Sequence, residues 1–224
     1  MTNNPTRTTA PSTPAVPRRV PRWGSVAHRR RWDARLSTAP GSASAANPQA
    51  WLVVAGGLLF LLARPALGGV AFAVPLLAVG YLALLVGALA VRRNQGNPPT
   101  RAPLGWKVPL LVGLVGVAGA AGVGGPGADR RVGGVAVGLA LGAAVAEEAL
   151  FRRVLYERLL RFGVVGAVVG SAGVFALVHL PAYGVAAMPV DLGAALLLSW
   201  QRYASGRWTV PAVTHAVANL LAVT

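Results

Sequence analysis

Apolar stretches long enough to cross a bilayer recur along this chain, and they constrain its fold more than any other feature. A helix needs about 20 mostly apolar residues to span the hydrocarbon core of a membrane. We count about seven such stretches, at residues 51–67, 69–91, 107–125, 132–161, 164–180, 188–202 and 208–224. The first is the weakest candidate, because Arg64 and Pro65 interrupt it. The pattern predicts an all-α fold, a polytopic membrane helix bundle of about seven transmembrane helices.

The composition supports the membrane class. Hydrophobic residues make up 54% of the chain and charged residues only 12%, which lies outside the usual range of soluble domains. Cysteine is absent from the sequence, which excludes a disulfide framework, thiolate metal ligation and cysteine nucleophilic catalysis.

The net charge of +15 could indicate nucleic-acid binding, but the arginines lie in the N-terminal tail and at the ends of apolar stretches. Arginine clusters at 92–93, 152–161 and 202–207 fall on the same side of the predicted bundle as the tail, and only Arg130 and Arg131 disagree. The positive-inside rule therefore predicts a cytoplasmic N-terminus, and the short loops suggest a bacterial plasma membrane. We expect the basic residues to contact membrane lipid, and we expect no nucleic-acid partner.

Three regions follow from these patterns. Residues 1–48 carry eight arginines, a single acid and no apolar run, so we expect a disordered, Arg- and Pro-rich cytoplasmic tail rather than a cleaved signal. Residues 49–131 contain the N-terminal transmembrane helices. Residues 132–224 contain the polar side chains that suggest a function.

Two adjacent acids, Glu147 and Glu148, lie in the middle of an apolar helix, although the whole chain has only six acidic residues. An acid at the centre of a span costs roughly 2.5–3.5 kcal/mol, so the two need a partner, a proton or a water-filled cavity. Arg152 follows Glu148 by four residues, shares its helix face and is the expected partner. Glu147 has Phe151 at that position instead, which makes it the candidate general base. The alternative is that both acids only offset the basic cluster at the end of the helix.

Two histidines also lie in apolar stretches. His179 follows Phe175 by four residues and Asn219 follows His215 by four, so each pair shares one face of a helix. His179 is suited to proton transfer or metal binding, and His215 and Asn219 to donating hydrogen bonds to a developing oxyanion. For either histidine alone, a packing role is the better explanation.

The depth of these residues in the membrane tests whether the motifs can lie close together. If 132–161 and 164–180 are antiparallel helices joined by a turn at Phe162, Glu147 lies 15 residues before the turn and His179 lies 17 residues after it. At about 1.5 Å per residue, the two side chains lie within roughly one helical turn of the same level. The motifs can therefore meet.

The motifs occur in a fixed order, Glu147-Glu148-x-x-x-Arg152, then Phe175-x-x-x-His179, then His215-x-x-x-Asn219. In this order they resemble the CPBP family of intramembrane proteases. That family includes CAAX-prenyl endopeptidases and bacterial, Abi-type relatives connected with bacteriocin processing and self-immunity. The resemblance covers about residues 132–224, which we interpret as a CPBP-like catalytic core.

The resemblance implies an intramembrane endopeptidase that hydrolyses a peptide bond of a membrane-associated protein or peptide, with prenylated CAAX-type proteins among the candidate substrates. The site residues that it implies are Glu147, Glu148, Arg152, His179, His215 and Asn219. In such a site Glu147, helped by His179, would activate a water. His215 and Asn219 would stabilise the oxyanion, and the remaining glutamate and arginine would hold the site together.

The resemblance leaves both a glutamate peptidase and a metalloprotease open. The chain has no His-Glu-x-x-His zinc motif. Glu147, His179 and His215 would nevertheless be enough for a Zn²⁺ site with water as the fourth ligand. Arg153 stands where the family often has a glycine, so a tight helix contact is not expected there.

Two other function classes compete with this interpretation. A proton-coupled transporter would also place carboxylates and histidines in its spans. Transporters commonly show internal repeats and interrupted helices in matching positions, which we do not find in this sequence. A non-catalytic immunity or binding protein of the same fold would have no use for two glutamates that are costly in a membrane.

Overall fold

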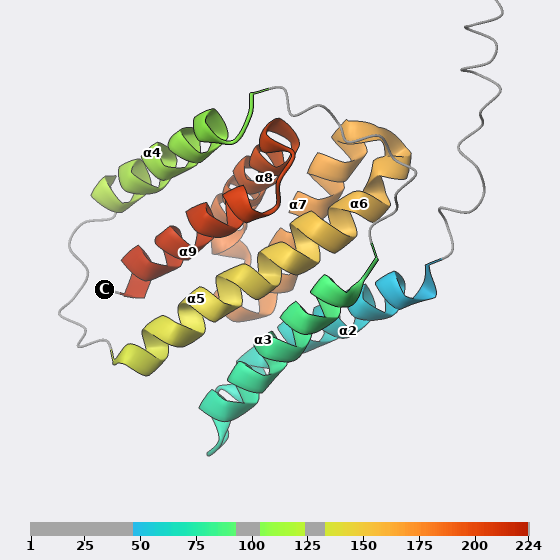
Figure 1. Cartoon of the computed structure of the whole chain (residues 1–224). Helices are drawn as coiled ribbons and strands as arrows, with labels where there is room; N and C mark the ends of the chain where they lie inside the picture. Colours follow the sequence, from blue (N-terminus) through green and yellow to red (C-terminus); the bar gives the residue numbers. More distant parts are fainter. Residues whose placement is uncertain (1–46, 93–103, 124–132, 224) are drawn as a thin grey trace, which may run out of the picture. The chain divides into compact units, whose positions relative to one another are not determined.

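The computed structural model describes residues 47–92, 104–123 and 133–223, and within these ranges all regular structure is helical. The described helices belong to one compact unit, Ala43–Thr224. Figure 1 shows them side by side in a bundle. The all-α prediction is confirmed. The predicted tail lies outside the described residues apart from its last two positions, as do Arg130 and Arg131.

Helix α2 (Pro48–Leu67) begins at a favourable N-terminus and runs without a break through Arg64 and Pro65. The Asn47 side chain accepts a hydrogen bond from the Ala50 amide at 3.3 Å, and proline at the first helical position has no amide hydrogen to leave unpaired. Arg64 and Pro65 interrupt the apolar pattern of this stretch but not its helix. The helix places Arg64 on its inner side, close to the pocket described below.

Helix α3 (Ala73–Ala90) packs against α2 with a close approach at Gly80. A Cβ atom at this position would lie 2.2 Å from the ring of Phe60, so a larger residue would push the ring away. The Phe60 ring instead meets Tyr81 edge to face, with 5.2 Å between the ring centroids. This packing fixes where the Tyr81 side chain lies.

Helix α4 (Lys107–Val123) packs against α8 (Met188–Ser205) and α9 (Thr209–Val223). The contact is polar and buried. Gln201 donates to the Pro109 carbonyl at 2.7 Å and to the Thr214 hydroxyl at 2.9 Å. Gly113 lies directly over this group, and a Cβ there would meet the Gln201 amide at 2.0 Å.

One long helical segment changes its winding at the glutamates. Helix α5 (Gly134–Glu148) is followed by a π-helical turn, η2 (Ala149–Leu155), and by the short α6 (Tyr156–Leu159). The segment was predicted as one helix, which is correct, but its middle is wider than an α-helix. Single π turns inside helices frequently occur at functional sites.

The chain then reverses near Phe162, as predicted. A 3-10 turn, η3 (Leu160–Phe162), leads to Gly163 with φ +81°, a left-handed conformation that favours glycine. Helix α7 (Gly163–Tyr183) follows and returns alongside α8. It was predicted to stop at Pro181, which is wrong: a proline near the last turn removes only one amide donor, and the helix continues to Gly184 (φ +75°). The extension adds Tyr183 to the pocket wall.

Among the described residues, three helical runs are long and apolar enough to cross a bilayer: Pro48–Leu67, Ala73–Ala90 and the 50-residue run Gly134–Tyr183, which contains the turn at Gly163. Two further apolar helices, Lys107–Gly122 and Thr209–Val223, are shorter. Helices occupy all seven predicted stretches, but the count of about seven membrane spans is not confirmed.

Candidate functional site

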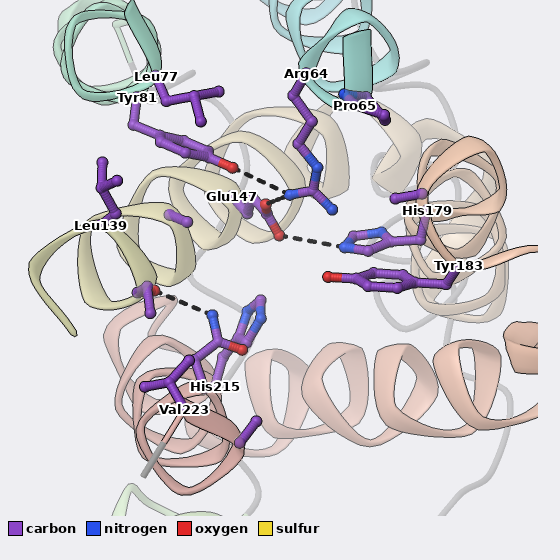
Figure 2. Close-up of a pocket in the computed structure, with 15 residues that line it drawn as sticks. Arg64, Pro65, Leu77, Tyr81, Leu139, Glu147, His179, Tyr183, His215 and Val223 are labelled. Carbon is purple, nitrogen blue, oxygen red and sulfur yellow. Dashed lines mark hydrogen bonds and ion pairs between the residues drawn. The ribbon is translucent and has the colours of Figure 1, made fainter. Parts of the chain in front are cut away.

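A pocket of about 410 Å³ lies among α2, α3, α5, α7 and α9 (Figure 2). The polar and aromatic side chains that line it are Arg64, Tyr81, Glu147, His179, Tyr183, His215 and Asn219. The remaining lining residues are apolar, mostly alanine, leucine and valine. A few convergent polar groups in an apolar cavity are typical of a binding or catalytic site.

Glu147 lies at the centre of the polar group. Its side chain is only 2% exposed and both carboxylate oxygens face other residues of the pocket. Oε1 accepts a hydrogen bond from Arg64 Nη1 at 2.6 Å, and Oε2 lies 3.6 Å from His179 Nε2. Glu147 and His179, predicted to lie at one depth, do meet.

His179 is held by its own helix. Its ring stacks on Phe175 at 4.3 Å and on Tyr183 at 5.7 Å, one turn before and one turn after it. Nδ1 lies 2.8 Å from the Phe175 carbonyl. Because a carbonyl oxygen only accepts, Nδ1 carries the hydrogen and Nε2 is the nitrogen that faces Glu147.

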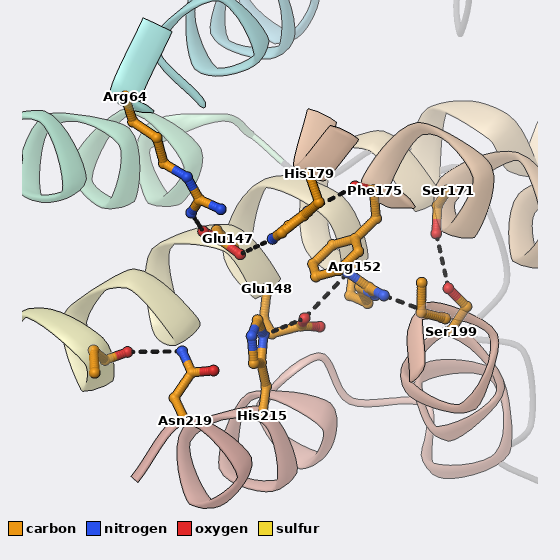
Figure 3. A network of polar contacts seen from close by, with 12 residues as sticks. Arg64, Glu147, Glu148, Arg152, Ser171, Phe175, His179, Ser199, His215 and Asn219 are labelled. Carbon is orange, nitrogen blue, oxygen red and sulfur yellow. Dashed lines mark hydrogen bonds and ion pairs between the residues drawn. The ribbon is translucent and has the colours of Figure 1, made fainter. Parts of the chain in front are cut away.

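Glu148 belongs to a second group, which is buried behind the pocket (Figure 3). Glu148 Oε1 lies 3.0 Å from His215 Nδ1 and 3.1 Å from Arg152 Nη1, and neither Glu148 nor Arg152 has measurable exposure. Arg152 also donates to the Ala195 carbonyl at 3.1 Å and lies over the Phe175 ring at 4.6 Å. The predicted Glu148–Arg152 ion pair is therefore present in the structure.

His215 and Asn219 line the pocket from α9. His215 contacts Glu148 through Nδ1, and the Asn219 amide donates to the Ala140 carbonyl on α5 at 3.0 Å. One of the two amide hydrogens of Asn219 is thus used to join α9 to α5. The six predicted residues come together, four in the pocket and two directly behind it.

The segment that carries all six residues was compared with known families. Residues 132–221 match the family model of type II CAAX prenyl endopeptidases, Rce1-like. The resemblance inferred from the three motifs is confirmed. The match points to a protease, and together with the apolar helices it indicates an integral membrane protein. No curated protein and no solved structure gives a significant match.

Arg64 lies outside the Rce1-like segment and was not predicted as a site residue. It donates from α2 to Glu147 on α5 and, at 3.1 Å, to the Tyr81 hydroxyl on α3. A signal was present in the sequence, because an arginine near the end of an apolar span needs a polar partner or an exit to water. We interpreted Arg64 only as an interruption of the span.

Arg153, which stands where the family often has a glycine, makes a different helix contact. Its guanidinium donates to the carbonyls of Ala88, Leu89 and Val91 at the C-terminal end of α3, where helix carbonyls lack partners in the helix itself. A cation at this end also interacts favourably with the helix dipole. A tight helix contact of the kind that glycine allows was not expected at this position. Arg153 instead links α3 to the Rce1-like segment through these hydrogen bonds.

The three residues considered for zinc do not fit a zinc site in this structure. Within the described ranges, no group of three or more His, Asp or Glu side chains is placed to hold a metal ion. His215 faces Glu148 rather than Glu147, and the Arg64 guanidinium covers one oxygen of Glu147. A cation that binds this carboxylate competes with a second positive charge at the same place.

Proposed function

We propose that this protein is an intramembrane endopeptidase that hydrolyses a peptide bond of a membrane-associated protein or peptide, with prenylated CAAX-type proteins among its candidate substrates. One observation carries the proposal: a buried carboxylate, Glu147, and an oriented imidazole, His179, both from the Rce1-like segment, line the same pocket. A carboxylate beside an imidazole can take a proton from water and return it later.

A water molecule in the pocket, to one side of the line between these two atoms, can contact both side chains at once. The 3.6 Å between Glu147 Oε2 and His179 Nε2 is longer than a hydrogen bond. With its hydrogen on Nδ1, a neutral His179 presents Nε2 as an acceptor, and the carboxylate is also an acceptor. One water can donate a hydrogen to each of them, which leaves its oxygen lone pairs free to attack.

The reaction that follows is a hydrolysis without a covalent enzyme intermediate. The water oxygen forms a bond to the carbonyl carbon of the substrate, and its proton moves to Glu147. The carbonyl oxygen becomes an oxyanion. The carbonyl re-forms as the carbon–nitrogen bond breaks, and the leaving nitrogen takes the proton from Glu147, which is then a carboxylate again.

His215 and Asn219 are the proposed oxyanion donors, as both line the pocket. His215 uses Nδ1 toward Glu148, so it can donate from Nε2 to the substrate only when both ring nitrogens carry a hydrogen. Asn219 has one further amide hydrogen beyond the one given to Ala140. Glu148 and Arg152 position His215 and do not touch the substrate.

We also propose that residues 49–131 and 132–224 together form a bundle of about seven membrane spans in a bacterial plasma membrane. Large apolar side chains on the outside of the helices support lipid contact, among them Leu52 at 72% and Val165 at 76% exposure. The cytoplasmic tail, residues 1–48, would contact anionic lipid.

The test is peptide cleavage by the purified, detergent-solubilised full chain against a library of prenylated and unprenylated peptides. Wild type, Glu147→Ala and Glu157→Ala are compared, with and without a metal chelator. Glu157 is a matched control: it lies on the same helical segment, pairs with Arg202 at 3.4 Å and is not among the pocket residues.

We expect cleavage by wild type and by Glu157→Ala and no cleavage by Glu147→Ala. Cleavage that persists in Glu147→Ala would remove this glutamate from the mechanism. Inhibition by the chelator, reversed by added Zn²⁺, would replace the glutamate peptidase with a metalloprotease.

A further inference from the structure

Arg64 is the one charged residue in α2 and belongs to none of the motifs that define the proposed site. It lies in the N-terminal helices, outside residues 132–221. Its side chain is nevertheless only 13% exposed and reaches Glu147, which is 83 positions away in the sequence. An arginine buried in an apolar bundle needs a compensating negative charge, and Glu147 provides it.

The contact is specific to one oxygen of the carboxylate. Arg64 Nη1 lies 2.6 Å from Glu147 Oε1, while Oε2 lies toward His179 (Figure 3). A carboxylate can rotate about its terminal bond, and a charge-assisted hydrogen bond to one oxygen restricts that rotation. Arg64 thereby determines that Oε2 is the oxygen that faces the gap beside His179.

The α2–α3 pair is built to hold the guanidinium in this position. Tyr81 on α3 accepts a hydrogen bond from the same Nη1 at 3.1 Å. The Tyr81 ring is placed in turn by its edge-to-face contact with Phe60, which Gly80 makes possible. Arg64 from α2 thus contacts a carboxylate of the Rce1-like segment directly, and Tyr81 from α3 supports it through Arg64 (Figure 2).

We propose that Arg64 is a positioning residue for Glu147, oriented by Tyr81, and that the N-terminal helices are therefore part of the working active site. Arg64 fixes the carboxylate as an oriented anion and acts through it on the attacking water. The inference rests on the proposed function, since it assigns a partner to the same general base.

The experiment measures kcat and KM for cleavage of the best library peptide by the full chain in detergent. Arg64→Met removes the cation, Arg64→Lys keeps it, and Tyr81→Phe removes only the hydroxyl. Arg92→Met is the matched control, because Arg92 is exposed at the end of α3 and does not line the pocket. The melting temperature of each variant is recorded.

We expect Arg64→Met to lower kcat by about 10²-fold with KM within about threefold, since a misoriented base loses much of the contribution of general base catalysis. Arg64→Lys restores kcat to within about tenfold of wild type, because a lysine keeps the charge but not the fork geometry. Tyr81→Phe lowers kcat by about three- to tenfold, the loss of one hydrogen bond. Arg92→Met leaves both constants unchanged.

Three results would overturn the inference. Unchanged kcat in Arg64→Met shows that Glu147 needs no such partner, and a raised KM with normal kcat shows that Arg64 binds substrate instead. If Arg64→Lys loses as much kcat as Arg64→Met, and both variants have a lower melting temperature than wild type, Arg64 contributes to folding alone. If wild type cleaves peptides and Glu147→Ala does not, these results reject only the role of Arg64. If wild type is inactive, the proposed function and the role of Arg64 are rejected together.

Discussion

Glu147 and Glu148 are adjacent in the sequence and have the same chemistry, but the fold gives them opposite surroundings. Adjacent residues on a helix point about 100° apart. Glu147 lines the pocket between Arg64 and His179, whereas Glu148 lies behind it between Arg152 and His215. One carboxylate can meet a substrate, and the other cannot.

The partners of the two glutamates differ in the same way. Glu148 shares one oxygen between Arg152 and His215, and its other oxygen, Oε2, is buried without a hydrogen-bond partner in the described part of the chain. Glu147 has one oxygen clamped by Arg64 and one that faces a gap beside an imidazole. This difference supports the proposal that Glu147 performs the chemistry, while Glu148 holds the buried group together and orients His215.

The largest expected effect is a loss of kcat on substitution of Glu147. Glu147→Gln keeps the size of the side chain but removes the base, so we expect kcat to fall by about 10²–10⁴-fold. The new amide oxygen can still accept from Arg64, which is 13% exposed, so the melting temperature should fall less than in variants of the fully buried Glu148–Arg152 pair. If Glu147→Gln cleaves at the wild-type rate, the assignment of different roles to Glu147 and Glu148 is wrong.

The next effect concerns stability and lies in the buried group. Arg152→Met leaves Glu148 as a buried charge without its cation, so we expect a loss of about 3–5 kcal/mol in the free energy of unfolding. Chemical or thermal denaturation in detergent measures it. If the double variant Arg152→Met/Glu148→Leu is no more stable than Arg152→Met alone, the ion pair is not the source of the loss.

Gly80→Ala tests the support of the pocket group. The added Cβ would overlap the Phe60 ring and shift Tyr81, and overpacking of this kind costs about 1–3 kcal/mol. Gly56→Ala is the matched control on α2, because nothing lies within 4 Å of a Cβ there. We expect lower stability and slower cleavage only in Gly80→Ala. If the two variants are equally stable and cleave at the same rate, the α2–α3 contact at Gly80 does not affect the site.

How far the sequence predicts this arrangement depends on the range of each contact. Glu148 and Arg152 are four residues apart on one helix, and Glu147 and His179 lie on two helices joined by a turn with a clear glycine signal. Local spacing is enough for both pairs. Arg64 meets Glu147 only through the packing of α2 against the Rce1-like segment, which no local pattern specifies.

The misjudged helix ends have a similar cause. Pro181 was taken as a stop and Pro65 as part of an interruption of the apolar pattern, but both prolines lie within the last turns of their helices, where the structure tolerates them. Tyr183 was missed as a result. The π turn at Ala149–Leu155 has no compositional signature in this chain; its widened backbone includes an Arg152 carbonyl that accepts from Arg202 at 2.9 Å.

The smallest expected effect concerns that missed residue. Tyr183 stacks on His179 from the side opposite Phe175, and such ring contacts are worth about 0.5–1.5 kcal/mol. Tyr183→Leu should therefore lower kcat by about two- to tenfold. Tyr183→Phe keeps the ring and should retain the wild-type rate. If the two variants are equally slow, the hydroxyl rather than the stack is responsible.

The central claim, that Glu147 activates a water rather than attacking the substrate itself, is tested most directly by a single turnover in H₂¹⁸O with enzyme in excess over peptide. Direct attack by water puts one ¹⁸O atom into the new carboxylate of the product in the first turnover, and mass spectrometry should detect it. An unlabelled first-turnover product would mean that the oxygen came from a glutamate carboxylate through a covalent intermediate, and it would contradict the account.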